Sequence, residues 1–257
     1  MAKWTPFPHA GDYTFDAAST RKSWARLHLG DGEALPIDAK VLAAWALFHN
    51  GDFQQAAEAG IKAGGGGITV ANKATAVYAT YLEPKEKTKL DLFMEVTARA
   101  EAQAKAEPGN PNAWYWHAYA LGRYSQGISV AKALAQGLGT KVKDSLERTI
   151  KLAPRHADAY IALGAFHAEV IDKVGALIGS MTYGAKKDVG LRLFQEALHI
   201  NPGSVIGMIE YANALVMLEG DKKMIEATKL YEQAAASQPM DATERLDVDM
   251  ARVELEN

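Results

Sequence analysis

The chain has 257 residues, of which 48% are hydrophobic and 23% charged, a composition typical of a globular protein with a substantial core. Its formal net charge of −3 gives no large basic surface for nucleic acid, and the absence of cysteine excludes disulfides and thiolate metal sites. No apolar run reaches the roughly 18 residues of a membrane span, and the first residues, with two prolines and an aspartate, lack the apolar core of a signal peptide. We therefore expect a cytoplasmic protein without membrane insertion.

Residues 1–37 are expected to form an N-terminal arm followed by a capping helix. The arm carries four aromatic residues, namely Trp4, Phe7, Tyr13 and Phe15. Aromatic residues near a terminus usually bury themselves, so we expect them to pack on the chain's own first hairpin, with a partner-binding arm as the alternative. The stretch "DAASTRKSWARLHLG" predicts an amphipathic helix that places Trp24 and Leu27 on the same hairpin.

Residues 38–239 contain a repeated pattern framed by prolines. The pattern appears at the sixth, ninth, tenth and thirteenth residues after Pro108, Pro154 and Pro202. In each of the three sets the tenth residue is small. The sets are Trp114, His117, Ala118, Leu121; Tyr160, Leu163, Gly164, His167; and Met208, Tyr211, Ala212, Leu215. Spacings of three, four and seven put each set on one helix face, and the small residue lets a second helix approach closely. The second helices end at prolines, which cannot continue a helix.

This pattern resembles the tetratricopeptide repeat (TPR), a helix-turn-helix unit of about 34 residues. "AYIALGAFH" and "LFQEALHINP" match it best, an earlier unit fits "KVLAAWALFHNGDFQQAAEAGIKAG", and a degenerate unit fits residues 71–106. The resemblance implies an all-α, right-handed TPR-like solenoid of about five helical hairpins. A C-terminal capping helix is expected in residues 240–257, with Asp241 as its N-cap and an apolar stripe of Leu246, Met250 and Val253.

Two of the repeats are longer than the family's usual length. The distance from Pro108 to Pro154 is 46 residues and from Pro154 to Pro202 it is 48, which indicates inserts between the first and second helices. The inserts are "SQGISVAKALAQGLGTK" and "EVIDKVGALIGSMTYGAKK", and residues 174–185 of the second carry no charge. Exposed apolar patches are avoided, so we expect the inserts to pack on each other through Leu134, Leu138, Leu177, Ile178 and Met181. They would serve either as extra core or as a lid over a binding cavity.

The inserted repeats are similar to two branches of the TPR family, the regulator of microtubule dynamics group and the TPR component associated with some TRAP transporters. The likeness covers about the last 100 residues, including "HAEVIDKVGALIGSMTYG" and "FQEALHINP". It concerns shape and implies no chemistry.

Catalytic signatures are missing from the sequence. His167 and Glu169 lie two residues apart, on different faces of a helix, and therefore do not form a zinc motif. His117 and His167 occupy packing positions of the repeat, and Gly64–Gly67 lacks the Lys-Ser/Thr of a phosphate-binding loop. We expect no enzyme activity, no cofactor and no metal.

The TPR resemblance implies a concave binding surface on the first helix of each unit, beside the packing stripe. The matching positions are Trp45, Phe48, His49; Tyr115, Tyr119, Arg123; Asp158, Ile161, Glu169; and Ile209, Asn213, Met217. This apolar and aromatic lining departs from the lysine and asparagine clamp by which some TPR domains hold a C-terminal carboxylate. It favours a scaffold that binds a peptide or helix of a protein partner, and the alternative is a small apolar ligand held beneath the inserts.

Overall fold

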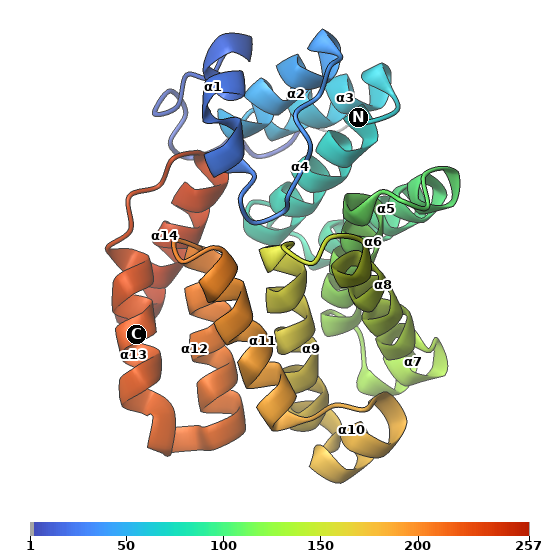
Figure 1. The fold of residues 1–257 in the computed structure, drawn as a ribbon, viewed down its shortest axis with the longest axis vertical. Coiled ribbons are helices and arrows are strands. Elements are labelled where there is room, and N and C mark those ends of the chain that lie inside the picture. Colours follow the sequence, from blue (N-terminus) through green and yellow to red (C-terminus); the bar gives the residue numbers. More distant parts are fainter. Residues whose placement is uncertain (1–2, 257) are drawn as a thin grey trace. The chain divides into compact units, whose positions relative to one another are not determined.

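The computed structural model describes residues 3–256, and all regular secondary structure in that range is helical (Figure 1). The helices are α1 (Ala17–Leu27), α2 (Ala39–His49), α3 (Phe53–Ala63), α4 (Gly67–Tyr81), α5 (Glu86–Ala106), α6 (Pro111–Gln126), α7 (Val130–Ala135), α8 (Leu138–Leu152), α9 (Ala157–Val174), α10 (Ala176–Tyr183), α11 (Lys187–Ile200), α12 (Val205–Glu219), the 3-10 helix η1 (Gly220–Lys223), α13 (Met224–Ala235) and α14 (Ala242–Glu256). The prediction of an all-α fold is confirmed.

Local sequence signals explain where several helices begin. Asp16 and Ser19 form a reciprocal capping box at the start of α1, which satisfies two backbone N–H groups that the first helical turn leaves without partners. The side chain of Asn110 accepts hydrogen bonds at the start of α6, and Pro111 follows it in the first turn, where a missing N–H costs nothing. Ser204 caps α12 in the same way.

The described residues form two compact units, which are considered separately. The first comprises residues 3–28, 33–148 and 240–243, and the second comprises residues 29–32, 149–239 and 244–256. The two units are defined by which residues contact one another and not by the boundaries of the sequence repeats. The boundaries expected at residues 37 and 239 therefore stay predictions.

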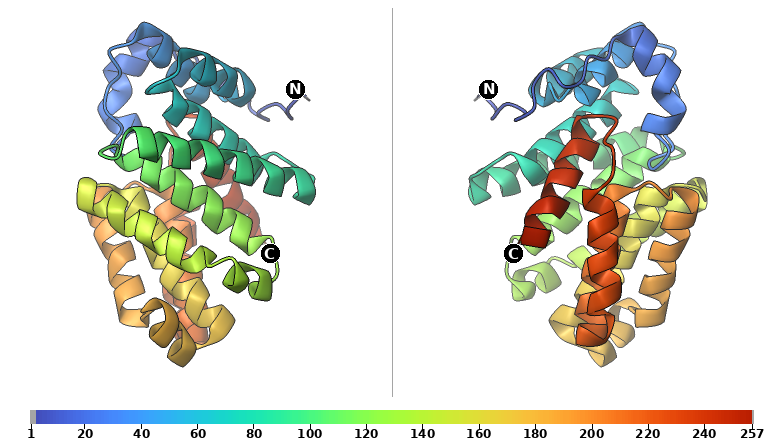
Figure 2. Two further views of the ribbon diagram at one scale, coloured as in Figure 1. Left: turned by 90° about the vertical axis from the view of Figure 1, so that its right-hand side faces the viewer. Right: turned by 90° about the vertical axis from the view of Figure 1, so that its left-hand side faces the viewer.

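The first unit is built from helical hairpins stacked in chain order. Helix α4 packs on α3 and α5 and also touches α2 and α6, while α6 packs on α5 (Figure 2). The turn between α2 and α3 contains Gly51 with φ 87°, a left-handed conformation that glycine adopts without strain. Phe53 and Ala56, in the first turn of α3, are buried. His117 on α6 lies 2.9 Å from the hydroxyl of Ser145 on α8, which marks the pairing of those two helices.

The second unit repeats the arrangement with α9 against α11 and α12 against α13. Gly164 of α9 faces the fully buried ring of Phe194 on α11. A Cβ atom at Gly164 would lie 2.8 Å from that ring, so the close approach expected from the small residue is confirmed.

The capping helices bury two of their five expected residues, Trp24 and Leu246, while Leu27 and Met250 are half-buried. Trp24 of α1 is buried and meets Trp45 edge to face at 5.8 Å. In α14, Val248 and Ala251 pack on residues of α12 and α13. The expected stripe is wrong at Val253, which is 56% exposed, because Val248 and Ala251 hold the inward positions instead.

The arm at residues 3–15 packs on the chain's own first hairpins, as expected. Trp4 stacks on Tyr78 of α4 with ring centroids 4.2 Å apart, and Phe7 is buried against Phe53 of α3. Phe15 approaches His49 at 5.6 Å.

The inserts form the short helices α7 and α10, but the burial expected for their apolar side chains is wrong at four of the five residues. Leu138 is buried, whereas Leu134, Ile178, Leu177 and Met181 are exposed, the last two at 74% and 80%. The reason lies in the small residues of the second insert. Gly179 is buried, and a Cβ atom there would lie 3.1 Å from Val170 of α9 and 3.6 Å from Ala185. Because Gly179 lies at the contact with α9, Leu177, Ile178 and Met181 face away from it, while Tyr183 meets Phe166 of α9 edge to face.

Candidate functional site

Six of the twelve residues expected on a binding surface are buried in the structure. They are Trp45, Phe48, His49, Tyr115, Ile161 and Ile209. A partner cannot contact them unless the fold opens, so their assignment to a binding surface is corrected to core.

Segments distant in the sequence cover Trp45 and His49. Trp45 is packed against Trp24 of α1, and His49 lies under Phe15 of the arm. The Nδ1 atom of His49 lies 2.7 Å from a carboxylate oxygen of Asp241. Hydrogen bonding to this carboxylate holds the segment that begins α14 against α2.

Neighbouring helices cover Ile161 and Ile209, whereas Tyr115 contacts a residue of its own helix. Ile161 of α9 reaches α12, where a Cβ atom at Gly207 would lie 3.1 Å from its side chain. Ile209 packs in a cluster with Val248 and Ala251 of α14. Tyr115 lies against Trp116, with ring centroids 5.0 Å apart.

The other six residues reach solvent, in two separate sets. Tyr119 and Arg123 are half-buried on α6 in the first unit. The second unit carries Asp158, Glu169, Asn213 and Met217, of which Asn213 and Met217 are exposed. Asn213 accepts a hydrogen bond from the hydroxyl of Tyr231, and Glu169 lies 4.0 Å from Lys173. Arg123 lines a cavity, and its guanidinium lies over the ring of Tyr119.

This cavity, of about 230 Å³, lies between the start of α5 and the end of α6. Its lining residues come from α4, α5, α6 and the residue after α6: Thr80, Glu86, Lys89, Leu90, Phe93, Arg123, Gln126 and Gly127. Gly127 allows the end of α6 to approach α5, because a Cβ atom there would lie 2.5 Å from the side chain of Leu90. The cavity therefore combines an apolar wall with charged groups at its edge.

Polar contacts fix the orientation of the site's side chains. The hydroxyl of Tyr119 is 2.9 Å from that of Thr80, and the guanidinium of Arg123 lies 5.3 Å from the centre of the Tyr119 ring. Arg123 also donates to the side-chain oxygen of Gln126, at 3.3 Å. At the other edge, Lys89 and Glu86 form an ion pair at 3.0 Å. Tyr119 and Arg123 thus offer an aromatic face and a cation in a fixed relation, which suits contact with a protein segment.

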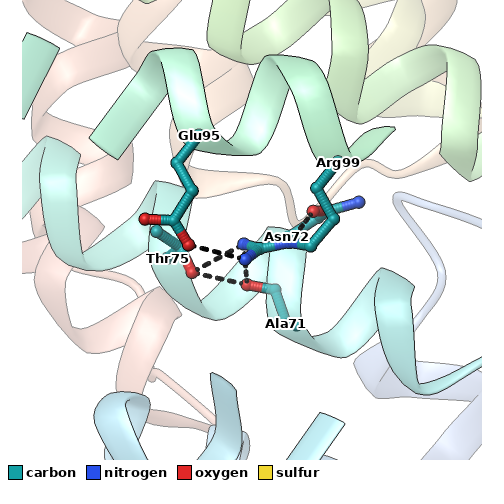
Figure 3. A network of polar contacts seen from close by, with 5 residues as sticks. All are labelled: Ala71, Asn72, Thr75, Glu95 and Arg99. Carbon is teal, nitrogen blue, oxygen red and sulfur yellow. Dashed lines mark hydrogen bonds and ion pairs between the residues drawn. The ribbon is translucent and has the colours of Figure 1, made fainter. Parts of the chain in front are cut away.

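A polar cluster between α4 and α5 was not anticipated from the sequence (Figure 3). Arg99 donates to the side chain of Asn72 at 2.6 Å, to the carbonyl of Ala71 at 3.2 Å and to the hydroxyl of Thr75 at 3.0 Å (Figure 3). It also pairs with Glu95 at 2.8 Å. Burial lowers the pKa of Arg99, while the charge of Glu95 opposes that shift.

The sequence does contain a signal for this cluster. Thr69, Asn72 and Thr75 recur every third residue in the otherwise apolar helix α4 and form a polar stripe on it. Gln103 of α5 donates to Thr69 and accepts from Asn72, which extends the cluster along the helix pair. All of these groups are satisfied within the fold, so the cluster specifies how α4 and α5 pack.

The two histidines singled out in the repeat also have partners within the fold. His167 accepts a hydrogen bond from the backbone N–H of Lys186 at 2.9 Å. His117 lies beside Ser145, and burial lowers its pKa. Among the described residues, no group of three or more histidines, aspartates or glutamates is placed to hold a metal ion.

Comparison with known structures defines the class of protein. The chain is similar to the crystal structure of a thermophilic TPR protein from Thermus thermophilus, with a TM-score of 0.59 and 14% sequence identity. The similarity covers 83% of this chain and 97% of that one. The fold is therefore a TPR-like α-solenoid, and fold alone is what this likeness shows.

A family model gives a narrower assignment. The model described as "Regulator of microtubule dynamics protein 1-3" matches residues 69–250, and the chain belongs to this family. The resemblance of the inserted repeats to the regulator of microtubule dynamics group is confirmed. A search of curated protein sequences gives no match. Within residues 3–256, none of the helices has the length and apolarity needed to cross a lipid bilayer.

Proposed function

We propose that the chain is a non-catalytic scaffold that binds a segment of a partner protein against the Tyr119–Arg123 face of α6. The TPR-like fold supports the general role, since domains of this kind present helix faces to other proteins. The single observation that carries the finer proposal is the stacked pair of Tyr119 and Arg123 at the edge of a cavity of about 230 Å³.

The chemistry of the site favours a peptide over a small apolar ligand. Tyrosine and arginine are enriched at the residues that dominate protein interfaces. Leu90 and Phe93 give the cavity an apolar part, and Arg123 and Lys89 also line it. An apolar ligand would place its surface against these charged groups at a desolvation cost. The exposed side chains of α10 give no support for a lid over such a ligand.

The proposal is tested by affinity capture with two tyrosine variants of the same helix. Tyr119→Ala removes the aromatic face and is expected to weaken partner capture by about tenfold, which corresponds to about 1.4 kcal/mol. Tyr124→Ala is the control, because Tyr124 lies five residues further along α6 and on another face. Equal capture by the parent chain and Tyr119→Ala would contradict the proposal.

A further inference from the structure

The arm meets the first unit in the way that a peptide meets a receptor. Residues 3–7 form neither helix nor turn, and Pro6 and Pro8 flank Phe7. A proline disfavours helical geometry in the residue before it, so both Thr5 and Phe7 are biased toward extended backbone. The segment therefore loses little conformational freedom when it lies along a surface.

Side chains of α3 and α4 bind the backbone of this segment. The N–H of Trp4 donates to the side-chain oxygen of Gln54 at 3.0 Å, and the N–H of Thr5 donates to the hydroxyl of Tyr78 at 3.3 Å. Tyr78 in turn donates to Glu83 at 2.8 Å, which fixes its ring and hydroxyl. Recognition of peptide backbone by side chains works for many sequences, and selectivity then depends on the side chains of the peptide.

Two aromatic side chains of the arm supply such selectivity. The Trp4 ring is nearly parallel to that of Tyr78, with an interplanar angle of 12°. Phe7 is only 5% exposed and meets the edge of Phe53 at 6.2 Å. Phe7 packs directly against Gly51, where a Cβ atom would lie 2.5 Å from the phenylalanine ring. Any other residue at that position would fill the space that Phe7 occupies.

We propose that Gly51, Phe53, Gln54 and Tyr78 form a second peptide-binding site, the arm groove, which the chain's own arm occupies in cis. Its ligand in trans is an extended, proline-containing segment of a partner protein with a tryptophan and a phenylalanine three residues apart. The argument for this occupant is the arm itself, whose Trp4-Thr5-Pro6-Phe7-Pro8 sequence satisfies the hydrogen-bonding groups and the aromatic contacts of the groove.

The arm groove does not include residues of the Tyr119–Arg123 site. In the arm groove, the chain's own arm competes with a partner segment for binding. A tethered segment acts at an effective concentration on the order of millimolar, so the arm holds the groove closed against weak ligands. A partner segment gains access when it binds more tightly than the arm or when the arm is displaced.

The test uses the full-length chain and a fluorescein-labelled peptide of residues 3–15, followed by fluorescence anisotropy. The variant Trp4→Ala, Phe7→Ala loosens the arm but leaves the groove unchanged. We expect it to bind the peptide at least about tenfold more tightly than the parent chain, whose own arm competes. A control peptide with alanine in place of the tryptophan and the phenylalanine is expected not to bind.

A third variant separates the groove from the arm. Adding Gln54→Ala to the loosened chain removes the side-chain oxygen that accepts a hydrogen bond from the backbone N–H of the tryptophan. We expect this change to weaken peptide binding several-fold. Should the double variant lose its native circular dichroism spectrum, Trp4→Ala alone takes its place, since the Trp4 side chain is only half-buried.

Three results would overturn the proposal. The first is no peptide binding by a loosened chain with a native spectrum, and the second is equal binding by the parent and the loosened chain. The third is a concentration-dependent dimer of the parent chain that disappears in Trp4→Ala, which would assign the groove to the arm of a second copy.

Discussion

Replacing Gly164 by alanine should destabilise the protein although it improves helix propensity. Alanine in place of a helical glycine normally stabilises by about 1 kcal/mol. At Gly164 the new methyl group would lie 2.8 to 3.0 Å from three carbon atoms of Phe194. That ring is fully buried and stacked on Tyr211 at 5.5 Å, so it has no free space to move into. Overpacking of this kind costs about 1–3 kcal/mol, which leaves a net loss of up to about 2 kcal/mol.

Gly122 of α6 is the matched control for this substitution. It is also a helical glycine, but a Cβ atom there would meet only Val142, at 4.0 Å. Gly122→Ala is therefore expected to stabilise by about 1 kcal/mol. Urea unfolding followed by circular dichroism at 222 nm measures both changes under the same conditions. The reasoning is refuted if Gly164→Ala is as stable as Gly122→Ala, because the packing of α9 against α11 would then not depend on the small residue.

Three further predictions concern other parts of the structure. Leu177→Asp is expected to change stability by less than about 0.5 kcal/mol, since Leu177 is exposed, and a large drop in melting temperature would restore the packed lid. Arg99→Lys should cost about 1–3 kcal/mol in urea unfolding, because an ammonium cannot replace the fork that binds Asn72, Ala71 and Thr75; an unchanged midpoint would show that the cluster is dispensable. His117 has a pKa lowered by burial, so the unfolded chain binds the proton more readily and stability is lost as pH falls through about 6.5. The melting temperature should therefore fall less steeply between pH 7 and pH 5 for His117→Gln than for the parent chain. Identical pH profiles of the melting temperature would contradict this role of His117.

The repeats could be predicted from the sequence because their signals are local. Prolines at 108, 154 and 202 mark hairpin boundaries, and the small residue ten positions after Pro154 marks the contact of Gly164 with Phe194. Periodicity within one helix identifies a packed face whatever lies elsewhere in the chain.

Positions beside the packed face could not be assigned in the same way. Trp45, Phe48 and His49 have the offsets of groove residues, but α1, the arm and Asp241 cover that part of the first hairpin. These covering segments lie far away in the sequence, and no local period encodes them. Tyr119 and Arg123 have similar offsets, and each keeps a solvent-accessible part in the structure.

For the inserts, the amino-acid composition predicts burial, whereas the geometry of the short helix leaves most of the large side chains exposed. An uncharged stretch with seven apolar residues predicts burial on average. In α10, however, Gly179 is the residue buried against α9, and large side chains on the opposite face cannot turn inward on so short a helix.

Crosslinking mass spectrometry of a captured partner tests the central claim most directly. Lys89, near the start of α5, lines the cavity together with Arg123 of α6. Lys105 lies near the end of α5 and is more exposed. An amine-reactive crosslinker should join the partner to Lys89 in preference to Lys105, and Tyr119→Ala should reduce that crosslink without changing the fold. Crosslinks concentrated on Lys105, or a Lys89 crosslink unaffected by Tyr119→Ala, would contradict a binding site at the Tyr119–Arg123 face.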